Sequence, residues 1–493
     1  MLRLNRTFYV LLLAATTICG CSQHEESEVT DPGSETTGIV FRLQANCTSA
    51  TTRSVEGNVE PRSQGSPEEY KVFNARVYLY DAPTKLFVKS ILLTNPQLKG
   101  TDKDGNIVYE TERVSVPQGA YDIFVIANSD KNISRDNEEQ FLAAIDSITY
   151  VQGLVTDISK GVVMTNRASD NIGVLVSNTA TSDENVISIM LERVLARLDI
   201  GKNSDSYALT DNSYKQYATV MLDRHYVVNV PKYYYLFRHA AVLTSLDEPT
   251  WSLSQNFGAV NEVNGYVIDP YFFKKTINAE EFTNQDKYYE HFMGNYTNPN
   301  SVAWTTFKSA GSYNTAYCLE NCMLAQAQKN AYSTGVFFDA RLEPYNNVYH
   351  LNATTGALEL VTDKTKYPEV IYYFNYNFYD SPEALAAAAG TTISATDLDV
   401  YQAKKFTKSD DGNYHCYYVY WIRHEDNPDN NKMGVMEFAI VRNNLYQMLV
   451  TNITGLGDTD ITIVPDKPDE GETYLKVVLN VKPWILRDIN IIL

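Results

Sequence analysis

Apolar and polar residues alternate with a period of two in many short stretches of this chain. Between Gly38 and Asn46, the large apolar residues Ile39, Phe41 and Leu43 occupy every second position. This is the period of a β-strand that buries one face and exposes the other. The first ordered element of the chain is therefore predicted to be a half-buried strand.

Further short stretches of the same kind begin at Tyr70, with turn signals such as Pro117-Gln118-Gly119 between them. Their number and spacing predict an all-β sandwich. A parallel α/β sheet would need helices between the strands, and the pattern contains almost none. The expected strands span Val72–Tyr80, Leu86–Leu93, Asn106–Val116, Tyr121–Asn128, Gly161–Met164, Ile172–Ser177, Val186–Leu191, Val194–Ile200, Tyr217–Leu222, Gly335–Leu342, Val370–Phe378, Tyr414–Ile422, Met436–Val441, Tyr446–Ile453, Leu475–Val481 and Ile485–Leu493.

A few short helices interrupt this series. One is expected at Glu138–Ile145 with Asp136 as its cap. A second is expected at Glu320–Ala331. The third is the clearest, because Ser381-Pro382-Glu383 places proline at the first helical position and Gly390 follows the alanine run. The stretch Thr244–Asn314 is irregular and rich in aromatic residues.

Composition narrows the class of protein. The chain has 493 residues, with 41 Lys and Arg against 60 Asp and Glu, so its formal net charge is −19. This balance argues against a nucleic-acid surface, which needs basic stripes, and against docking on an anionic membrane face. The six cysteines are too few and too scattered for a disulfide scaffold, and the 36 tyrosines favour strands with half-exposed faces.

The N-terminus has the pattern of an export signal. Basic residues precede an apolar run, Phe8–Ile18, which is too short to span a membrane. A small residue, Gly20, then precedes Cys21, as at a lipoprotein signal-peptidase site. We expect cleavage between them and acylation of Cys21, whose lipid chains would anchor the protein. An ordinary secretory signal with a chance cysteine is the alternative, but the polar, acidic stretch Ser22–Thr37 is typical of a tether.

Motifs of catalysis and metal binding are missing from the chain. There is no H-E-x-x-H, P-loop or G-x-S-x-G sequence. The C-x₃-C pair Cys318/Cys322 does not have a usual zinc spacing and is interpreted as buried or paired thiols in a helix, with His415-Cys416 far away in the chain. His424 is interpreted as part of a solvated turn. The aspartate pairs Asp102/Asp104 and Asp458/Asp460 lack the rest of a calcium loop.

Clusters of tyrosine, such as Tyr233–Tyr235 and Tyr372–Tyr373, have two interpretations. Aromatic rings can form a platform for a sugar, but such runs are more often sheet faces with cross-strand aromatic pairs. We therefore predict no catalytic, cofactor-binding or metal-binding residue.

Several segments, weak singly but in consistent order over nearly the whole chain, resemble one family. They are similar to the type V fimbrial subunits (fimbrillins) of Bacteroidia, and most to the shaft subunits of the minor fimbrium. The irregular stretch Thr244–Asn314 has no counterpart. The matching segments are Cys21, Gly38–Arg53, Val116–Asn128, Arg193–Asp199, Tyr317–Asn321, Val441–Tyr446, Thr451–Gly457 and Val481–Trp484.

The resemblance implies two transthyretin-like β-sandwich domains and no enzymatic activity. It also implies export as an outer-membrane lipoprotein, cleavage by an Arg-specific surface protease, and polymerisation on the cell surface by strand exchange. The partners would be other copies of this chain and accessory anchor and tip subunits, with no cofactor. The expected division is a signal peptide at 1–20, a propeptide at 21–53, an N-terminal domain at 54–200 and a C-terminal domain at 201–493.

The residues themselves are compatible with such an exchange. The loop after the first strand, Cys47–Pro67, contains Arg53 and Arg62, so that one cut would release the strand. Arg53 follows the strand closely, and we expect cleavage between Arg53 and Ser54, with Arg62 as second choice. The strand offers Ile39, Phe41 and Leu43, and the last strand offers similarly spaced residues that can fill the same pockets, Ile489, Ile491 and Leu493.

Three alternatives remain at this stage. A tip or anchor subunit of the same fimbrium is the nearest, although an anchor should lack the Arg-containing loop and keep its lipid. A glycan-binding surface lipoprotein would also use Cys21 and many tyrosines, but it would not need matching first and last strands. An enzyme is third, and without the family resemblance two ordinary sheet strands that never exchange would be the simpler interpretation.

Overall fold

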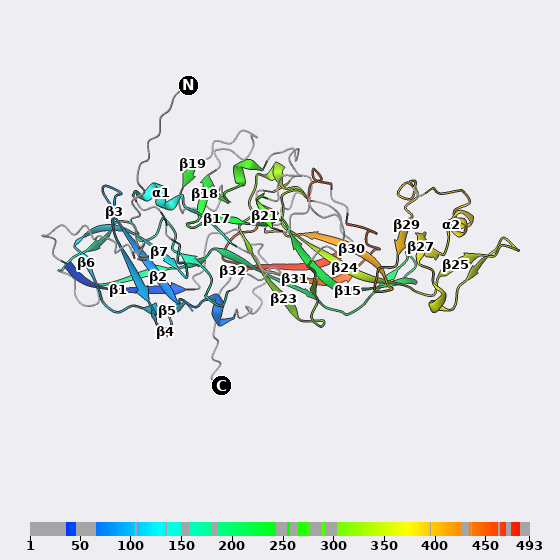
Figure 1. Ribbon diagram of the computed structural model, residues 1–493, viewed down its shortest axis with the longest axis horizontal. Coiled ribbons are helices and arrows are strands. Elements are labelled where there is room, and N and C mark those ends of the chain that lie inside the picture. Colours follow the sequence, from blue (N-terminus) through cyan, green and yellow to red (C-terminus); the bar gives the residue numbers. More distant parts are fainter. Residues whose placement is uncertain are drawn as a thin grey trace, which may run out of the picture. The chain divides into compact units, whose positions relative to one another are not determined.

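The sandwich predicted from the alternating pattern is present in the computed structural model (Figure 1). The described residues lie within one compact unit, Glu35–Leu493. The structure describes residues 36–45, 66–103, 106–131, 133, 136–148, 158–178, 185–242, 254–256, 265–275, 287–290, 303–394, 396–424, 433–434, 436–461, 464–469 and 475–483.

Two sheets form the N-terminal sandwich. One has the strand order β11-β1-β5-β4, with β6 also paired to β1, and the other has the order β12-β9-β7-β2-β3, with β10 paired to β7. The strands of the first sheet are β1 (Thr36–Ala45), β4 (Gln97–Thr101), β5 (Ile107–Glu110), β6 (Val114–Pro117) and β11 (Val186–Met190). Those of the second are β2 (Asn74–Asp81), β3 (Phe87–Thr94), β7 (Gly119–Ala127), β9 (Met164–Thr165), β10 (Val174–Val176) and β12 (Glu192–Arg193).

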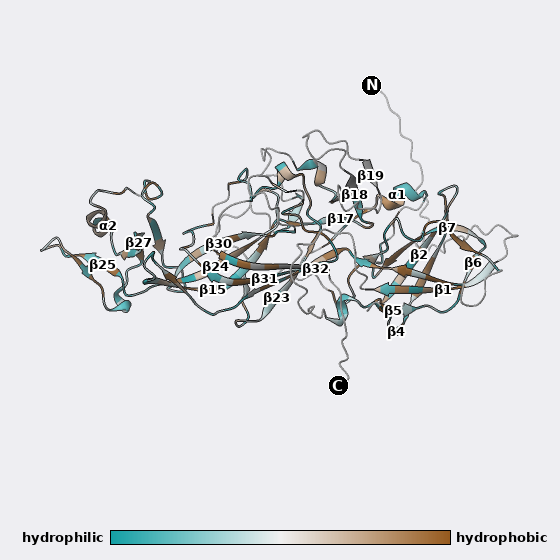
Figure 2. Ribbon diagram, turned by 180° about the vertical axis from the view of Figure 1, so that it is seen from behind, coloured by the Kyte–Doolittle hydropathy of each residue, from teal (hydrophilic) through white to brown (hydrophobic). Residues whose placement is uncertain are grey.

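The sheet that contains β2 and β7 is buried on both faces. Its residues Val77 and Ile123 pack in the core of the N-terminal sandwich. The intervening residues Tyr78 and Phe124 pack on the opposite face, in a second and larger core. Strand β7 is accordingly apolar at nearly every position, with Asp122 as its one charged residue, which is typical of strands covered on two sides, and hydrophobic segments of the sheet are visible in the hydropathy colouring (Figure 2).

Helix α1 (Glu138–Leu142) packs an aromatic side chain against this second face. The ring of Phe141 lies 4.6 Å from Tyr78, 5.9 Å from Phe124 and 5.1 Å from Phe237, between ring centres. The cap of the helix is Asn137, whose side chain accepts a hydrogen bond from Gln140 N. The predicted cap, Asp136, is wrong by one residue.

A second pair of sheets encloses the larger core. Their strand orders are β23-β13-β31-β32 and β14-β15-β24-β30, with β22 on β15. The strands of the first are β13 (Leu195–Lys202), β23 (Tyr313–Leu319), β31 (Asn444–Ile453) and β32 (Leu475–Pro483). Those of the second are β14 (Tyr207–Thr210), β15 (Gln216–Val228), β22 (Thr305–Thr306), β24 (Gly335–Pro344) and β30 (Tyr414–Trp421). The predicted division after residue 200 falls within β13 and stays a prediction.

Smaller elements complete the described part of the chain. A sheet of order β26-β25-β28-β27-β29 packs with helix α2 (Pro382–Ala389), which begins after the cap Ser381 and ends at Gly390, as predicted. Its strands are β25 (Val348–Leu351), β26 (Leu358–Leu360), β27 (Val370–Phe374), β28 (Asn377–Tyr379) and β29 (Lys404–Thr407). The remaining elements are β8 (Ile145–Ser147), β16 (Val230–Pro231), β17 (Tyr233–Tyr235), β18 (His239–Val242), β19 (Ser254–Asn256), β20 (Gly265–Ile268), β21 (Tyr289–Glu290) and the 3₁₀ turns η1 (Pro67–Glu69), η2 (Phe272–Lys274), η6 (Ala325–Ala327) and η7 (Lys364–Lys366).

Several predicted elements differ in the structure. The stretch Gly161–Met164 is strand only at its last residue, where β9 begins, and Asn106–Val116 is divided into β5 and β6. The helix expected at Glu320–Ala331 is replaced by β-bridges and the short turn η6. The strand expected at Met436–Val441 is a turn followed by one bridge, Asn321–Ile440. The stretch Val370–Phe378 forms a tight hairpin, because Asn375 and Tyr376 adopt left-handed backbone conformations. The last expected strand, Ile485–Leu493, lies outside the described residues.

The all-β sandwich class is thus confirmed, with few and short helices. In the described part of the chain, neither α-helix has the length or apolar character needed to cross a membrane.

Candidate strand-exchange site

The first strand, β1, is an interior strand of its sheet. On one side it pairs in parallel with β11, from Val40 to Gln44. On the other side it pairs antiparallel with β6 through its first half and with β5 through its second half. Because both edges of β1 are occupied, its removal would leave unpaired backbone groups on all three of these strands.

Alternate side chains of β1 fill the core of the N-terminal sandwich. Ile39 is 2% exposed, and Phe41 and Leu43 are fully buried, together with the smaller Ala45. They pack in one cluster with residues of the opposite sheet, such as Val77 and Ile123. Burial of each large side chain is worth about 1.5–3 kcal/mol. The inward face predicted from the alternation of residues is therefore confirmed.

Outward-facing residues of β1 make surface contacts. The Arg42 guanidinium lies 2.8 Å from the Glu110 carboxylate, and Gln44 donates a hydrogen bond of 2.8 Å to Asp102. Solvent-exposed pairs of this kind contribute little to stability. The strand is thus held mainly by backbone ladders and apolar side chains, which any strand with similar side chains could reproduce.

The other residues predicted for processing and exchange lie outside the described part of the chain. These residues are Gly20, Cys21, Arg53, Ser54, Arg62, Ile489, Ile491 and Leu493. The two predicted protease sites, Arg53 and Arg62, fall between β1, which ends at Ala45, and Ser66, where the described chain resumes.

Glu69 fixes the chain close to Ser66, the first residue of the next described stretch. Glu69, in the turn η1, is 1% exposed. Its carboxylate accepts hydrogen bonds from Arg197 Nη1, at 3.1 and 3.2 Å, and from the Tyr317 hydroxyl at 2.7 Å. Arg193 Nε donates to its backbone carbonyl at 2.6 Å. Glu69 thereby attaches the stretch that begins at Ser66 to β13 and β23.

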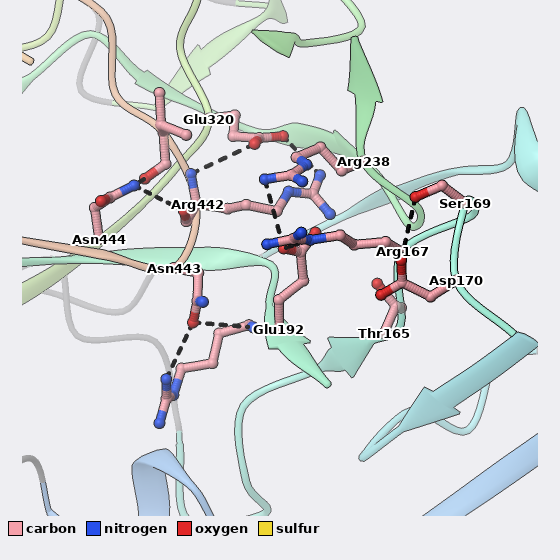
Figure 3. A network of polar contacts seen from close by, with 12 residues as sticks. Thr165, Arg167, Ser169, Asp170, Glu192, Arg238, Glu320, Arg442, Asn443 and Asn444 are labelled. Atoms are coloured by element: carbon pink, nitrogen blue, oxygen red, sulfur yellow. Dashed lines mark hydrogen bonds and ion pairs between the residues drawn. The ribbon is translucent and has the colours of Figure 1, made fainter. Parts of the chain in front are cut away.

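A buried network of charged side chains lies beside this anchor (Figure 3). Arg442, fully buried, forms an ion pair of 2.6 Å with Glu320 and donates to the backbone carbonyls of Leu236 and Tyr235. Glu192 lies 3.6 Å from Arg238 and 3.4 Å from Arg167.

Burial and charge oppose one another within this network. Burial raises the pKa of the Glu320 carboxyl, although Arg442 and Arg238 counteract the shift. Burial also lowers the pKa of Arg238, and its neighbours Arg167 and Arg442 add to that effect. Removal of one partner from a buried ion pair leaves the other charge uncompensated, which strongly destabilises the folded state.

Three of the sequence segments that resemble fimbrillins meet at this network. Arg193 belongs to the first, Glu320 to the second, and Arg442 and Asn443 to the third. Asn443 Oδ1 accepts a hydrogen bond of 3.1 Å from Arg193 Nη1, across 250 residues of sequence. The sequence analysis did not predict that these residues interact. The available signal in each segment was a charged residue directly next to an apolar one in the sequence.

Two histidines of the described chain, His415 and His424, are buried and hydrogen-bonded to other side chains. His424 is buried and hydrogen-bonds the Tyr446 hydroxyl at 2.8 Å, so its interpretation as part of a solvated turn is wrong; burial lowers its pKa to about 4. His415 is also buried; burial opposes its protonation, but hydrogen bonds to Asp339 and Asp411 raise its pKa.

Three cysteines of the described chain are buried and form no disulfide. Cys318 belongs to β23, Cys322 follows the bridge residue Asn321, and Cys416 belongs to β30. Their expected place in a helix is wrong, because no helix forms there. Among the described residues, no group of three or more His, Cys, Asp or Glu side chains is arranged to hold a metal ion.

The chain that leads to the C-terminus is anchored before it reaches β32. Asp469 is buried, and its carboxylate accepts a hydrogen bond from the Ser333 hydroxyl. Its backbone N–H donates to Gln328 O. From there the chain continues to β32, which pairs antiparallel with β31 at the edge of its sheet.

Two family models match the two ends of this arrangement. Residues 41–194 match the model described as major fimbrial subunit protein (FimA), and residues 412–490 match the model described as major fimbrial subunit protein type IV, fimbrillin, C-terminal. The sandwiches are thus those of a fimbrial subunit. Both models describe fimbrial subunits, so the chain is similar to fimbrillins at both ends, as the sequence resemblance predicted, although the C-terminal model is of type IV where the resemblance suggested type V.

Solved structures of low sequence identity accompany these matches. A putative cell adhesion protein from Parabacteroides distasonis has 13% identity and a TM-score of 0.43, over 91% of this chain and 100% of its own. A fimbrilin (FimA) from Porphyromonas gingivalis has 14% identity and a TM-score of 0.42, over 91% and 98%. The tip fimbrial protein Mfa3 of the same species, truncated at its C-terminus, has 11% identity and a TM-score of 0.35, over 91% and 100%. No curated protein matches the chain. The family assignment rests on the two family models.

The buried ion pair leads to a first prediction. Replacement of Glu320 by Gln leaves Arg442 and Arg238 with one carboxylate fewer, and we expect the free energy of unfolding to fall by about 3–5 kcal/mol. The matched control is Glu359→Gln, which removes the charge from an exposed pair with His350 and should cost less than about 1 kcal/mol. Chemical denaturation measures both; equal effects would contradict the importance of the buried pair.

Asp469 leads to a second prediction, on pH. Burial raises its pKa from 3.8 to about 8, so the folded protein holds a proton that the unfolded chain releases above pH 3.8. This contribution to stability is complete below pH 3.8 and is lost as the pH rises towards 8. We expect Asp469→Asn, which cannot ionise, to flatten the fall in melting temperature between pH 5 and 8. A variant with the same pH profile as the parent protein would contradict the assignment.

Proposed function

We propose that this chain is a shaft subunit of a surface fimbrium and polymerises by strand exchange. It is exported as a precursor acylated at Cys21 and held at the outer membrane. An Arg-specific surface protease cuts after Arg53, β1 leaves its groove, and the last strand of another copy takes its place. Accessory anchor and tip subunits complete the fimbrium, which supports adhesion.

The observation that carries the proposal is the placement of β1. It occupies an interior position, its inward residues Ile39, Phe41 and Leu43 fill core pockets, and few polar contacts are specific to it. The C-terminal residues Ile489, Ile491 and Leu493 repeat the same spacing of large aliphatic side chains. A donor strand can therefore replace both the ladders and the apolar contacts that β1 supplies.

Cleavage supplies the switch in this scheme. Before the cut, residues 46–65 link β1 covalently to the rest of its own subunit, so β1 has a high effective concentration at its groove. After the cut, β1 competes as a separate peptide. Because the lipid of Cys21 stays on that peptide, exchange also frees the subunit from its anchor. Glu69 keeps the new N-terminal region attached to β13 and β23.

Particular features of the chain disfavour the two alternative roles. An anchor subunit should keep its lipid and lack a cleavable loop, whereas this chain has Arg53 and Arg62 between β1 and Ser66. A glycan-binding lipoprotein would not need an interior first strand that matches the last one.

The cleavage site leads to a third prediction. Surface-sheared protein should begin at Ser54, and Arg53→Ala should leave an uncut precursor that does not polymerise. The matched control is Arg62→Ala, which should be processed normally. Mass spectrometry of the N-terminus measures both. A mature N-terminus at Ser63 would move the site to Arg62, and a surface polymer that begins at Cys21 would refute removal of the strand.

The donor strand leads to a fourth prediction. Removal of Ile489–Leu493 should leave a folded, cleavable monomer that cannot extend a fibre, because these residues would pack in another subunit. In an ordinary core strand, the loss of three large apolar side chains would cost several kcal/mol, comparable to the stability of a domain. A melting curve beside a polymer assay separates the two cases.

Single substitutions sharpen this test. Ile491→Asp places an unpaired charge in an apolar pocket and should block polymerisation without a change in the melting temperature of the monomer. The matched control is Ile492→Asp, one residue on and therefore on the opposite face of a strand, which should polymerise more readily than Ile491→Asp. An unfolded truncation, or heat-resistant ladders formed by the truncated protein, would refute the donor assignment.

A further inference from the structure

A pocket with a volume of about 670 Å³ is lined by residues that belong to neither sheet of the N-terminal sandwich. It forms where the β14–β15 hairpin, the β27–β28 hairpin, the stretch 399–404 and the loop 454–456 meet. Its volume is typical of small-molecule sites. None of the elements that form it belongs to the strand-exchange site.

Aromatic rings form much of the pocket wall. Tyr217, Tyr373 and Tyr376 come from two different sheets and contact one another, with the Tyr217 ring 5.8 Å from Tyr373 and 5.2 Å from Tyr376. Phe374 and Tyr401 line the pocket as well, and Tyr401 is 38% exposed. Partly exposed ring faces at a concave surface provide apolar contact area that the fold itself does not use.

Polar side chains accompany the rings. Asn212, Asn375, Asp399 and Gln402 all line the pocket. Within the described part of the chain, none of these four side chains makes a hydrogen bond to the protein. They offer amide donors, amide acceptors and one carboxylate to whatever enters.

The backbone at the pocket is held in unusual conformations. Asn375, Tyr376 and Gln402 have φ angles of 46°, 63° and 54°. Such angles are uncommon outside glycine, above all for a bulky residue such as tyrosine, and they persist only where the surrounding structure imposes them. On another wall of the pocket, Lys404 Nζ donates hydrogen bonds to the carbonyls of Leu456 and Gly457 at 3.2 and 2.9 Å and so holds the loop 454–456 in place.

We propose that this pocket binds a neutral oligosaccharide of about two or three sugar rings. The apolar C–H faces of sugar rings pack on aromatic side chains, while their hydroxyl groups need both donors and acceptors at the rim. An anionic glycan fits less well, because Asp399 contributes negative charge and the ammonium of Lys404 is already bound to two carbonyls and to Asp458. This binding activity goes beyond the proposed function and does not depend on polymerisation.

Calorimetric titration of the folded full-length precursor tests the proposal. The probes are lactose, maltotriose and N-acetylchitotriose, with 3′-sialyllactose as the anionic comparison, each up to about 10 mM. We expect at least one neutral probe to bind and to bind at least about tenfold more tightly than the sialylated one. No binding by any neutral probe, or a preference for the sialylated one, would overturn the proposal.

Variants locate the site. Asn375→Gly and Gln402→Gly delete the amides, and glycine accepts their positive φ angles without strain, so the fold should be retained. Each should weaken binding at least about tenfold, as should Tyr401→Ala. The matched control is Tyr345→Ala, since Tyr345 is 48% exposed but does not line the pocket. Unchanged affinity in the pocket variants, or equal loss in the control, would refute this location.

Discussion

Buried charge is the constraint on which the fold depends most. A guanidinium as deeply buried as that of Arg442 is tolerated only when a carboxylate and several carbonyls surround it. Those groups come from segments more than 100 residues apart in sequence, and they meet only if every intervening strand is in register. The network therefore adds a strict test of correct assembly to the non-directional packing of the two cores.

The β1 region follows the opposite physical rule. Its contacts are backbone ladders and aliphatic packing, which are strong but are not specific to one sequence. Buried polar contacts of the kind that β1 lacks are made by Glu69, which is bound by Arg197 and Tyr317. Under the proposed exchange, β1 would leave while Glu69 and the chain that follows it would stay.

Local pattern was enough to predict the elements whose stability is local. The inward face of β1 follows from the alternation of Ile39, Phe41 and Leu43, and α2 follows from its proline and glycine caps. The prediction failed where tertiary contacts decide. The Glu320–Ala331 segment contains good helix formers, but Glu320 pairs with Arg442 and the segment bridges Ile440 instead. Strand pairing in general depends on partners distant in sequence, such as β11 beside β1, which no local period reveals.

The functional sites were also hard to predict, because they too depend on contacts between residues distant in sequence. The spacing of residues identified the strand face that fills the core, but it could not indicate that three weak motifs converge on one ion-pair network. The aromatic pocket was equally hidden, because Tyr217 and Tyr376 come from separate sheets. The one indication in the sequence was the tyrosine cluster Tyr372–Tyr373, whose rings can form a platform for a sugar.

The mixed pairing of β1 has a consequence for the geometry of any assembly built by exchange. A replacement strand preserves both ladders only if it runs parallel to β11 and antiparallel to β5 and β6. Its direction is thereby dictated by the acceptor, and donor and acceptor are different surfaces of the same molecule. Such a contact is heterologous and does not have to close into a ring. The product would be a polar filament, with one end that can only receive a strand and another that can only give one.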